Sequence, residues 1–308
     1  ICDYHTLRTQ LLKFIAVVPA LTHDNSGITL KNSYIETANN ISKSFEKMPV
    51  YIKPFFKISE IISLLIPSKY FKSFVEFNIS YIAKRFICTE DKVGAGKIIK
   101  NLHLTGRNCT FDQLGELVIC QAEADEYCRK ILDLINSPEL FESATKLNQA
   151  NIPSHHISIK TSALTPHFNE DPEAFDFVYQ DIKPRFLQLF SAAEKYKTYL
   201  NFDAEHYHYR ELTINLIFYF LEEHKQFNYF SSFGFVVQAY LKDSHLHLEK
   251  LLKKAKKRAH AIPLRLVKGA YWDAETIDAK AKNYESPQFL NKVETDIQYR
   301  HLVHVILK

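Results

Sequence analysis

The chain has 308 residues, of which 46% are hydrophobic and 24% charged, and this composition excludes an intrinsically disordered protein. Its 39 basic and 35 acidic residues leave a net charge of only +4, which argues against a nucleic-acid binder, since that would need a concentrated basic face. Five cysteines without a C-x-x-C pair favour a reducing, cytoplasmic compartment, and no apolar run approaches the roughly 18 residues of a membrane-spanning helix.

Residues 1–106 are predicted to form an all-helical N-terminal arm. The stretches YIETANNISKSFEKM (34–48) and YFKSFVEFNISYIAKRF (70–86) place apolar residues at helical spacing. Phenylalanine and tyrosine are denser here than a small helical arm needs for its own packing. Two interpretations of this excess stay open: packing onto a second domain, and peripheral contact with a partner or with the inner membrane.

Residues 107–308 have a different sequence pattern from residues 1–106, because five times a short apolar run precedes a long helical stretch. Strands that alternate with helices predict βα units and a parallel sheet. The spacing matches an α/β barrel in which five of eight units are present. A doubly wound open sheet is the alternative, although no strand is followed by a G-x-G-x-x-G turn. The predicted strands lie within residues 110–116, 156–164, 199–205, 233–240 and 262–272.

A polar residue interrupts each predicted strand near its carboxyl end, where a barrel has its active site. The pattern predicts a polar mouth, although some of these groups are equally expected to form ion pairs between strands, Lys160 with Asp203 first. No strand end carries a G-x-S-x-G serine or a cysteine, which favours an enzyme whose bound cofactor does the chemistry. The set comprises Asp112, Lys160, Asp203, Glu205, Gln238, Arg265 and Lys268.

Three other patterns are weaker signals. The segment GAGK (94–97) resembles half a phosphate-binding loop but lacks the earlier glycine and the following Ser or Thr. The histidine pairs in HYH (206–208) and HLH (245–247) have a spacing that favours solvated side chains over zinc ligands, so no metal site is expected. The basic run KLLKKAKKRAH (250–260) is typical of one solvated helix face.

Five motifs in order resemble those of the proline dehydrogenase family. The segment RLVKGAYWDAE (265–275) resembles the family's fifth-strand motif. The segments FDQLGE, ISIKTSALTPHF, NFDAE and GFVVQAY resemble its first, second, third and fourth, and together the motifs span about residues 110–272. The resemblance implies a (βα)8 barrel that binds FAD, occurring alone or as a domain of bifunctional proline utilization A.

The resemblance also implies an activity and partners. Members of the family oxidise L-proline to Δ1-pyrroline-5-carboxylate by hydride transfer to FAD, and pass the electrons to a membrane quinone. An aldehyde dehydrogenase would then act as a fused domain or as a partner. The expected location is cytoplasmic, with peripheral attachment to the inner membrane left open. The sequence leaves homo-oligomerisation undecided.

Carried over residue by residue, the family's site falls on the predicted strand ends. Lys160 would pair with the proline carboxylate and Asp203 would hold that lysine charged. Arg265 would lie beside the flavin ring, which makes Lys160, Asp203 and Arg265 the expected catalytic residues. Gln238 would bond the flavin from the neighbouring strand. The remaining expected cofactor contacts are Asp203, Ala204, Val267, Lys268, Gly269, Ala270 and Trp272.

The sequence departs from the family in two respects. DAEH (203–206) stands where DAEE is usual, and IKTSAL carries Thr161 where leucine is common. The family's sixth to eighth strands, with the paired arginines that clamp the proline carboxylate, have no counterpart within these residues. Two alternative functions therefore stay open, a non-catalytic barrel fragment and an aldolase-type barrel with Lys160 or Lys268 as a Schiff-base amine.

Overall fold

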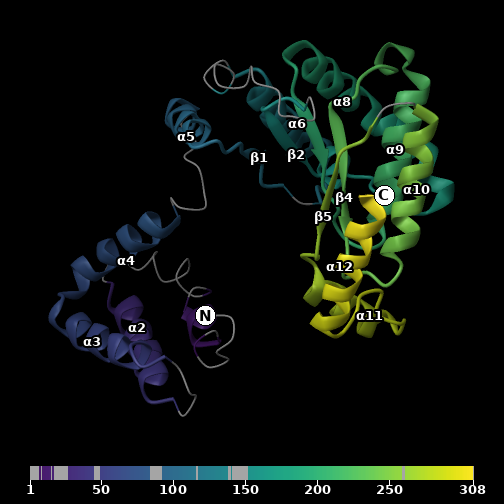
Figure 1. Ribbon diagram of the computed structural model, residues 1–308. Helices are drawn as coiled ribbons and strands as arrows, with labels where there is room; N and C mark the ends of the chain where they lie inside the picture. The colour runs from purple at the N-terminus through teal and green to yellow at the C-terminus, as the bar shows by residue number, and fades with distance from the viewer. Residues whose placement is uncertain are drawn as a thin grey trace. The chain divides into compact units, whose positions relative to one another are not determined.

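The computed structural model describes residues 7, 9–14, 16, 27–44, 49–83, 92–115, 117–137, 140, 152–258 and 261–307, and of residues 78–83 the backbone alone. The chain forms two compact units, Ile1–Thr89 and Glu90–Lys308 (Figure 1). Within the described residues, no helix combines the length and apolar character needed to cross a bilayer. The predicted domain boundary after residue 106 stays a prediction.

The N-terminal unit is helical, as the sequence predicts. Its helices are α2 (Ile28–Ser42), α3 (Ile52–Leu65) and α4 (Ser68–Ala83), and residues 45–48 and 84–86 of the two predicted helical stretches lie outside the described residues. A small core joins Leu30 to Phe71 and Val75. The Lys31 ammonium donates hydrogen bonds to the carbonyls of Leu64 (3.2 Å) and Ile66 (2.7 Å), which satisfies backbone oxygens at the end of α3.

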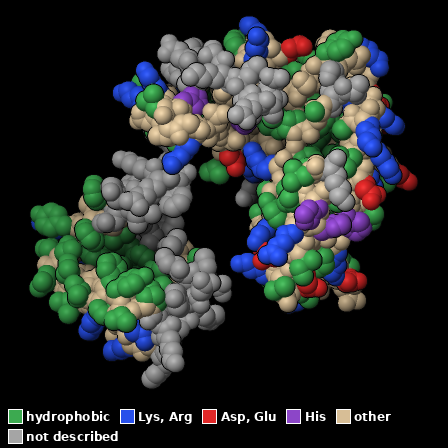
Figure 2. Space-filling view, viewed as in Figure 1, with side chains coloured by type: hydrophobic (Ala, Val, Ile, Leu, Met, Phe, Trp, Pro, Cys, Tyr) green, Lys and Arg blue, Asp and Glu red, His purple; other side chains and the backbone are tan. Residues whose placement is uncertain are grey.

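Large apolar side chains cover much of the surface of this unit (Figure 2). Tyr51, Phe55, Leu65 and Phe77 are each more than half exposed, because among the described residues the small core of α2 and α4 leaves the outer faces of the helices uncovered. The aromatic excess of the sequence is therefore a real surface feature. Its two interpretations, a second domain or a partner surface, stay predictions.

The C-terminal unit is an α/β half-barrel of five parallel strands in the order β1-β2-β3-β4-β5, which confirms the predicted fold class. GAGK (94–97) lies inside α5, so the phosphate-loop interpretation is wrong. The elements are α5 (Lys92–Leu104), β1 (Thr110–Asp112), α6 (Gln121–Ile135), β2 (His156–Ile159), η1 (Thr161–Leu164), η2 (Pro172–Ala174), α8 (Phe175–Tyr196), β3 (Tyr199–Phe202), α9 (Tyr209–Glu223), η3 (Lys225–Phe227), β4 (Phe233–Gln238), α10 (Ser244–Arg258), β5 (Leu264–Val267), α11 (Trp272–Lys282) and α12 (Lys292–Ile306).

The two faces of the sheet differ in chemistry because alternate strand residues point to opposite sides. The register aligns Ile159, Phe202 and Phe235 across three neighbouring strands, and all three belong to the core under α6, α8, α9 and α10. The next residues back along the strands, Ser158 and Asn201, are buried polar groups that face the other way. The inner face of the half-barrel therefore carries buried polar groups on β2 and β3.

Phe190 in α8 is the centre of an aromatic cluster under the sheet. It is fully buried and its ring centroid lies 4.9–6.5 Å from six other phenylalanine rings. Such edge-to-face and offset contacts add to the stabilisation from burial itself. The partners are Phe186, Phe202, Phe220, Phe227, Phe230 and Phe233.

We expect Phe190→Ala to lower the free energy of unfolding by about 3–5 kcal/mol, because it leaves a cavity among these rings. Phe177→Ala is the matched control, since Phe177 lies on the same helix but is 60% exposed. Its free energy of unfolding should change by at most about 0.5 kcal/mol. Urea denaturation of both variants measures the difference, and equal destabilisation would contradict this assignment of the core.

Candidate active site at the strand ends

The strand pairing brings the predicted site residues to one mouth. Lys160 directly follows β2 and Asp203 directly follows β3. The register of β2 to β5 places Lys160, Asp203 and Arg265 at one level of the inner face. Gln238 ends β4 two positions further on, opposite Val267 at the end of β5. Groups separated by more than 100 residues in the chain thus lie at one end of the half-barrel.

Several polar side chains of the mouth contact the carboxylate of Asp203. Its Oδ1 accepts a hydrogen bond from Asn201 Nδ2 at 2.7 Å and lies 3.4 Å from Arg265 Nη1. Its Oδ2 lies 3.6 Å from Lys160 Nζ. Arg265 Nη1 also donates to Ser158 Oγ at 3.2 Å. One carboxylate therefore lies between two cations, as expected for Lys160 with Asp203.

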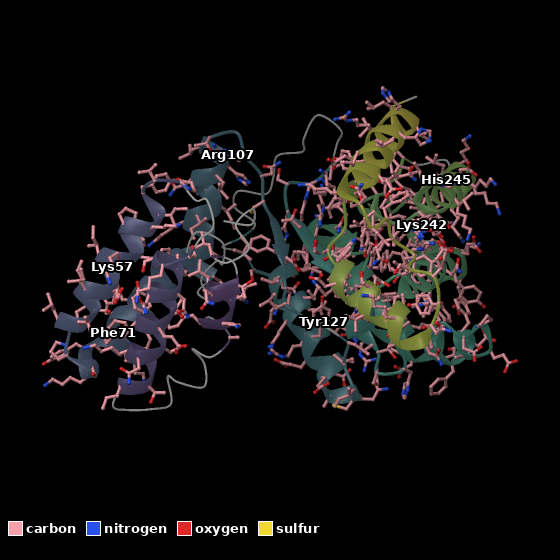
Figure 3. All side chains as sticks on the ribbon, turned by 90° about the horizontal axis from the view of Figure 1, so that it is seen from below. Lys57, Phe71, Arg107, Tyr127, Lys242 and His245 are labelled. Carbon is pink, nitrogen blue, oxygen red and sulfur yellow. The ribbon has the colours of Figure 1, made fainter. Side chains whose placement is uncertain are left out.

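Lys160 is held as a cation. Its Nζ donates to Asp112 Oδ1 at 3.0 Å, and its side chain is only 14% exposed. Burial by itself lowers the pKa of Lys160, but the hydrogen bond and charge of Asp112 and the charge of Asp203 more than offset it, and the net shift is upward. The backbone N–H of Lys160 donates to Tyr127 Oη at 3.0 Å, from the α6 helix beside the sheet (Figure 3).

The two carboxylates of the NFDAE segment have separate tasks. Burial raises the pKa of Asp203, and the charges of Lys160 and Arg265 pull it down without offsetting the burial. Burial likewise raises the pKa of Glu205, which accepts hydrogen bonds from Ser162 Oγ (2.5 Å) and Ser162 N–H (3.3 Å). Glu205 therefore ties the loop after β3 to η1, whereas Asp203 faces the mouth.

Gln238 offers an unused acceptor at the mouth. Its Nε2 donates to the carbonyls of Ala204 (3.4 Å) and Glu205 (3.3 Å), which fixes the amide against the loop after β3. Among the described residues, its buried Oε1 has no hydrogen-bond partner. A buried oxygen without a partner costs free energy, and a donor group of a bound molecule would recover it.

The segment after β5 is exposed, and its backbone at Gly269 packs against the ring of Tyr240. Lys268, Gly269, Ala270 and Trp272 are all exposed. Gly269 has a φ of +139°, and a Cβ there would lie 2.1 Å from the ring of Tyr240, so its glycine is required by this close approach.

Two of the expected cofactor contacts already have protein partners. Lys268 Nζ lies 2.5 Å from Asp296 Oδ1 in α12, and Trp272 Nε1 donates to the carbonyl of Phe289 at 3.0 Å. A phosphate at this segment would have to share Lys268 with Asp296. The cofactor roles of Lys268 and Trp272 stay predictions.

Sequence reasoning missed residues that support the site. Ser158 and Asn201 stand two positions before Lys160 and Asp203, and the two-residue period of a strand would have placed them on the same face. Tyr127 gave no local signal, because its contact with Lys160 spans 33 residues of sequence.

Other features are separate from this mouth. Across the described ranges, no three His, Cys, Asp or Glu side chains are grouped to hold a metal ion. A hollow of about 250 Å3 lies among α8, α9 and α10, lined by Phe175, Phe218, Tyr219 and Lys254 among others. All its lining residues come from helices on the outer face, so it is distinct from the strand ends.

Known proteins are similar to this chain in sequence and in fold. The model of the family described as "Proline dehydrogenase" matches residues 95–308. "Bifunctional protein PutA" of Salmonella typhimurium is 28% identical over 228 residues, and that of Rhizobium meliloti is 30% identical over 226 residues. Each match covers 73% of this chain but only 17% and 18% of the relatives, so the chain spans less than a fifth of their length.

Two solved structures show the same architecture. The structure of proline utilization A (PutA) from Bdellovibrio bacteriovorus, inactivated by N-propargylglycine, has a TM-score of 0.75 at 26% identity. That match covers 97% of this chain and 28% of the other. PutA from Corynebacterium freiburgense has a TM-score of 0.56 at 27% identity, over 67% of this chain and 20% of the other.

We expect Asp112→Asn to lower the pKa of Lys160, because burial would then be opposed mainly by Asp203. Only the neutral amine reacts with acetic anhydride, so Lys160 should be acetylated about twofold to fivefold faster at neutral pH, as read by peptide mass spectrometry. Asp296→Asn is the control, since it removes the partner of Lys268 and should leave the rate at Lys160 unchanged. Equal Lys160 rates in the parent and Asp112→Asn would refute the pairing with Asp112.

Proposed function

This chain belongs to the proline dehydrogenase family, and we propose that it is the barrel part of an FAD-dependent enzyme that oxidises L-proline to Δ1-pyrroline-5-carboxylate. The observation that carries the proposal is the set of charged groups at the strand ends, where Asp203 lies between Lys160 and Arg265. Because the chain spans less than a fifth of its curated relatives, the activity is proposed for the full-length protein.

The residues of the mouth fit an FAD. Gln238 offers a donor of the flavin ring its buried Oε1, which has no hydrogen-bond partner in the part of the chain that the structure describes. Arg265 is 39% exposed at the mouth, so its guanidinium can lie beside the ring. Asp203, Ala204, Val267 and the exposed residues after it would hold the remainder, with Gly269, Ala270 and Trp272 beside the linker and Lys268 shared between Asp296 and the phosphates. When bound, FAD supplies the acceptor for two electrons.

Lys160 is proposed to bind the substrate carboxylate. Its ammonium stays protonated because Asp112 and Asp203 raise its pKa, and a bound carboxylate would take the place of the exposed Asp112. Asp203 would remain as the fixed partner that orients the ammonium. Arg265 would supply positive charge where negative charge develops on the acceptor. L-Proline loses a hydride and a proton in this reaction, and its ring becomes the imine.

The raised pKa of Lys160 argues against Lys160 as the Schiff-base amine of the aldolase-type alternative. A Schiff-base lysine needs a lowered pKa so that the neutral amine can attack a carbonyl. Asp112 and Asp203 instead stabilise the charged form of Lys160. Oxidation of L-proline by the full-length protein would exclude the non-catalytic alternative.

Further partners follow from the family. We propose a membrane quinone as the electron acceptor and an aldehyde dehydrogenase, fused or separate, for the product; relatives that carry the name "Bifunctional protein PutA" support a fused arrangement. A cytoplasmic protein with peripheral contact at the inner membrane would bring the exposed apolar side chains of the N-terminal unit near the quinone pool.

The full-length protein should be yellow and should reduce an artificial quinone when L-proline is added. Lys160→Ala should raise the KM for L-proline about tenfold to a hundredfold, because a charged hydrogen bond to the substrate is lost, while FAD content stays unchanged. Lys183→Ala is a control, because Lys183 pairs with Glu223 on the outer helices. A colourless full-length protein would refute the flavoenzyme proposal, and loss of FAD in Lys160→Ala would reverse the roles assigned to substrate and cofactor.

Arg265→Ala should lower the FAD content or shift the flavin potential to a more negative value, because the cation beside the ring is removed. Arg265→Lys should retain part of either property, since it keeps the charge but not the planar guanidinium. Flavin absorbance after gel filtration and a redox titration measure both effects. Unchanged flavin content and potential in Arg265→Ala would contradict the assignment.

A further inference from the structure

His206 joins the loop after β3 to the segment after β5. It occupies the last position of DAEH, where this sequence departs from the family's usual DAEE. Its ring lies 4.6 Å from the ring of Tyr271, the residue directly before α11, and 5.9 Å from that of Tyr209 at the start of α9. The His206 side chain is 45% exposed, so it contacts Tyr271 without being locked in the core.

Glu275 gives His206 a buried charge partner. The Glu275 side chain, in the first turn of α11, is only 1% exposed. Its Oε1 accepts the backbone N–H of Tyr207 at 2.7 Å and lies 3.6 Å from His206 Nδ1. A buried carboxylate needs hydrogen bonds and a counter-charge, and His206 supplies the counter-charge only when it is protonated.

The surroundings of His206 favour its protonated form. The Glu275 carboxylate, 3.6 Å from the ring, raises the pKa of His206 more than burial lowers it, and the charges of Glu205 and Asp278 act in the same upward direction. These groups come from both neighbouring elements, the loop after β3 and α11. The other side chains that face the ring are Tyr271 and Tyr209, and burial raises the pKa of Tyr209.

Tyr271 links His206 to the segment after β5. It immediately follows Lys268, Gly269 and Ala270, the exposed residues expected to contact the cofactor, and it contributes to the upward shift of the Lys160 pKa. The loop after β3 that carries His206 also begins with Asp203, which contacts the same Lys160. His206 therefore joins the loop that carries Asp203, a partner of the proposed substrate-binding ammonium, to the segment that carries Tyr271.

We propose that protonated His206 is a positioning residue that holds Tyr271 and the start of α11 against the mouth, and thereby tightens the binding of L-proline at lower pH. The inference rests on the proposed function. Loss of the His206 proton removes the counter-charge of Glu275, so the two loops are joined less firmly as the pH rises above the pKa of His206. Substrate affinity then falls, while the reacting groups themselves are unchanged.

The test compares His206→Gln with His208→Gln in the full-length protein from about pH 6 to about pH 9. His208 is the matched control because it lies on the same loop with 34% of its side chain exposed, but contacts Tyr284 and Asp278 instead of Glu275. The ratio of the KM for L-proline in His206→Gln to that in the parent cancels the ionisation of proline itself. We expect this ratio to be about twofold to fivefold near pH 6 and to approach one near pH 9, with kcat unchanged.

The melting temperature supplies a readout that does not depend on activity. Because the pKa of His206 is raised in the fold, its contribution to stability is present at low pH and is lost as pH rises through that pKa. His206→Gln should therefore melt below the parent near pH 6 and together with it near pH 9, whereas His208→Gln should show no such convergence.

The outcomes separate the two proposals. A pH-dependent melting difference with a KM ratio of one at every pH would make His206 purely structural and overturn the positioning role. Absence of the melting difference would overturn the ion pair itself. A pH-dependent melting difference in a full-length protein that binds FAD but does not oxidise L-proline would refute the proposed substrate, and the positioning role with it, while leaving the ion pair intact.

Discussion

The carboxylate of Asp203 is the constraint on which the polar mouth depends. Two cations from different strands, Lys160 and Arg265, face one another across the inner surface of the half-barrel and would repel if no anion lay between them. Asp203 is itself largely buried, so its ionised form depends in turn on those cations. The three charges are therefore interdependent, and a change at any one alters the other two.

This polar inner face explains where the hydrophobic core must lie. Because the inward positions of β2, β3 and β5 include Ser158, Asn201 and Arg265, the main apolar cluster lies on the outer face, beneath the helices. Phenylalanines are concentrated there, around Phe190. Large rings fill a wide, one-sided layer with few residues, which is consistent with the 23 phenylalanines of this sequence.

The sequence was sufficient to predict the strands and most of the mouth, because both depend on local patterns. The short apolar runs located all five strands, but the run 262–272 contains only four strand residues, Leu264–Val267. Beyond Val267 the chain turns through Gly269 against Tyr240, and this close approach depends on a residue about 30 positions away. The Asp296 partner of Lys268 and the Tyr127 partner of Lys160 are equally non-local. The periodicity of the sequence cannot predict these contacts, because they join residues that lie far apart in the chain.

Several supports of the mouth come from other βα units than those that carry the supported residues. Tyr127 of α6 holds the backbone of Lys160 after β2, Ser162 of η1 holds Glu205 after β3, and Glu275 of α11 holds the backbone of Tyr207 in the same loop. Each contact crosses from one unit to another, so the geometry of the mouth exists only when the units have assembled side by side. A substitution at such a support can change substrate binding without touching the substrate, because it moves a loop that does. For this reason, the residues that tune affinity in this half-barrel are expected to include those that contact the charged groups and their loops, and not only the charged groups themselves.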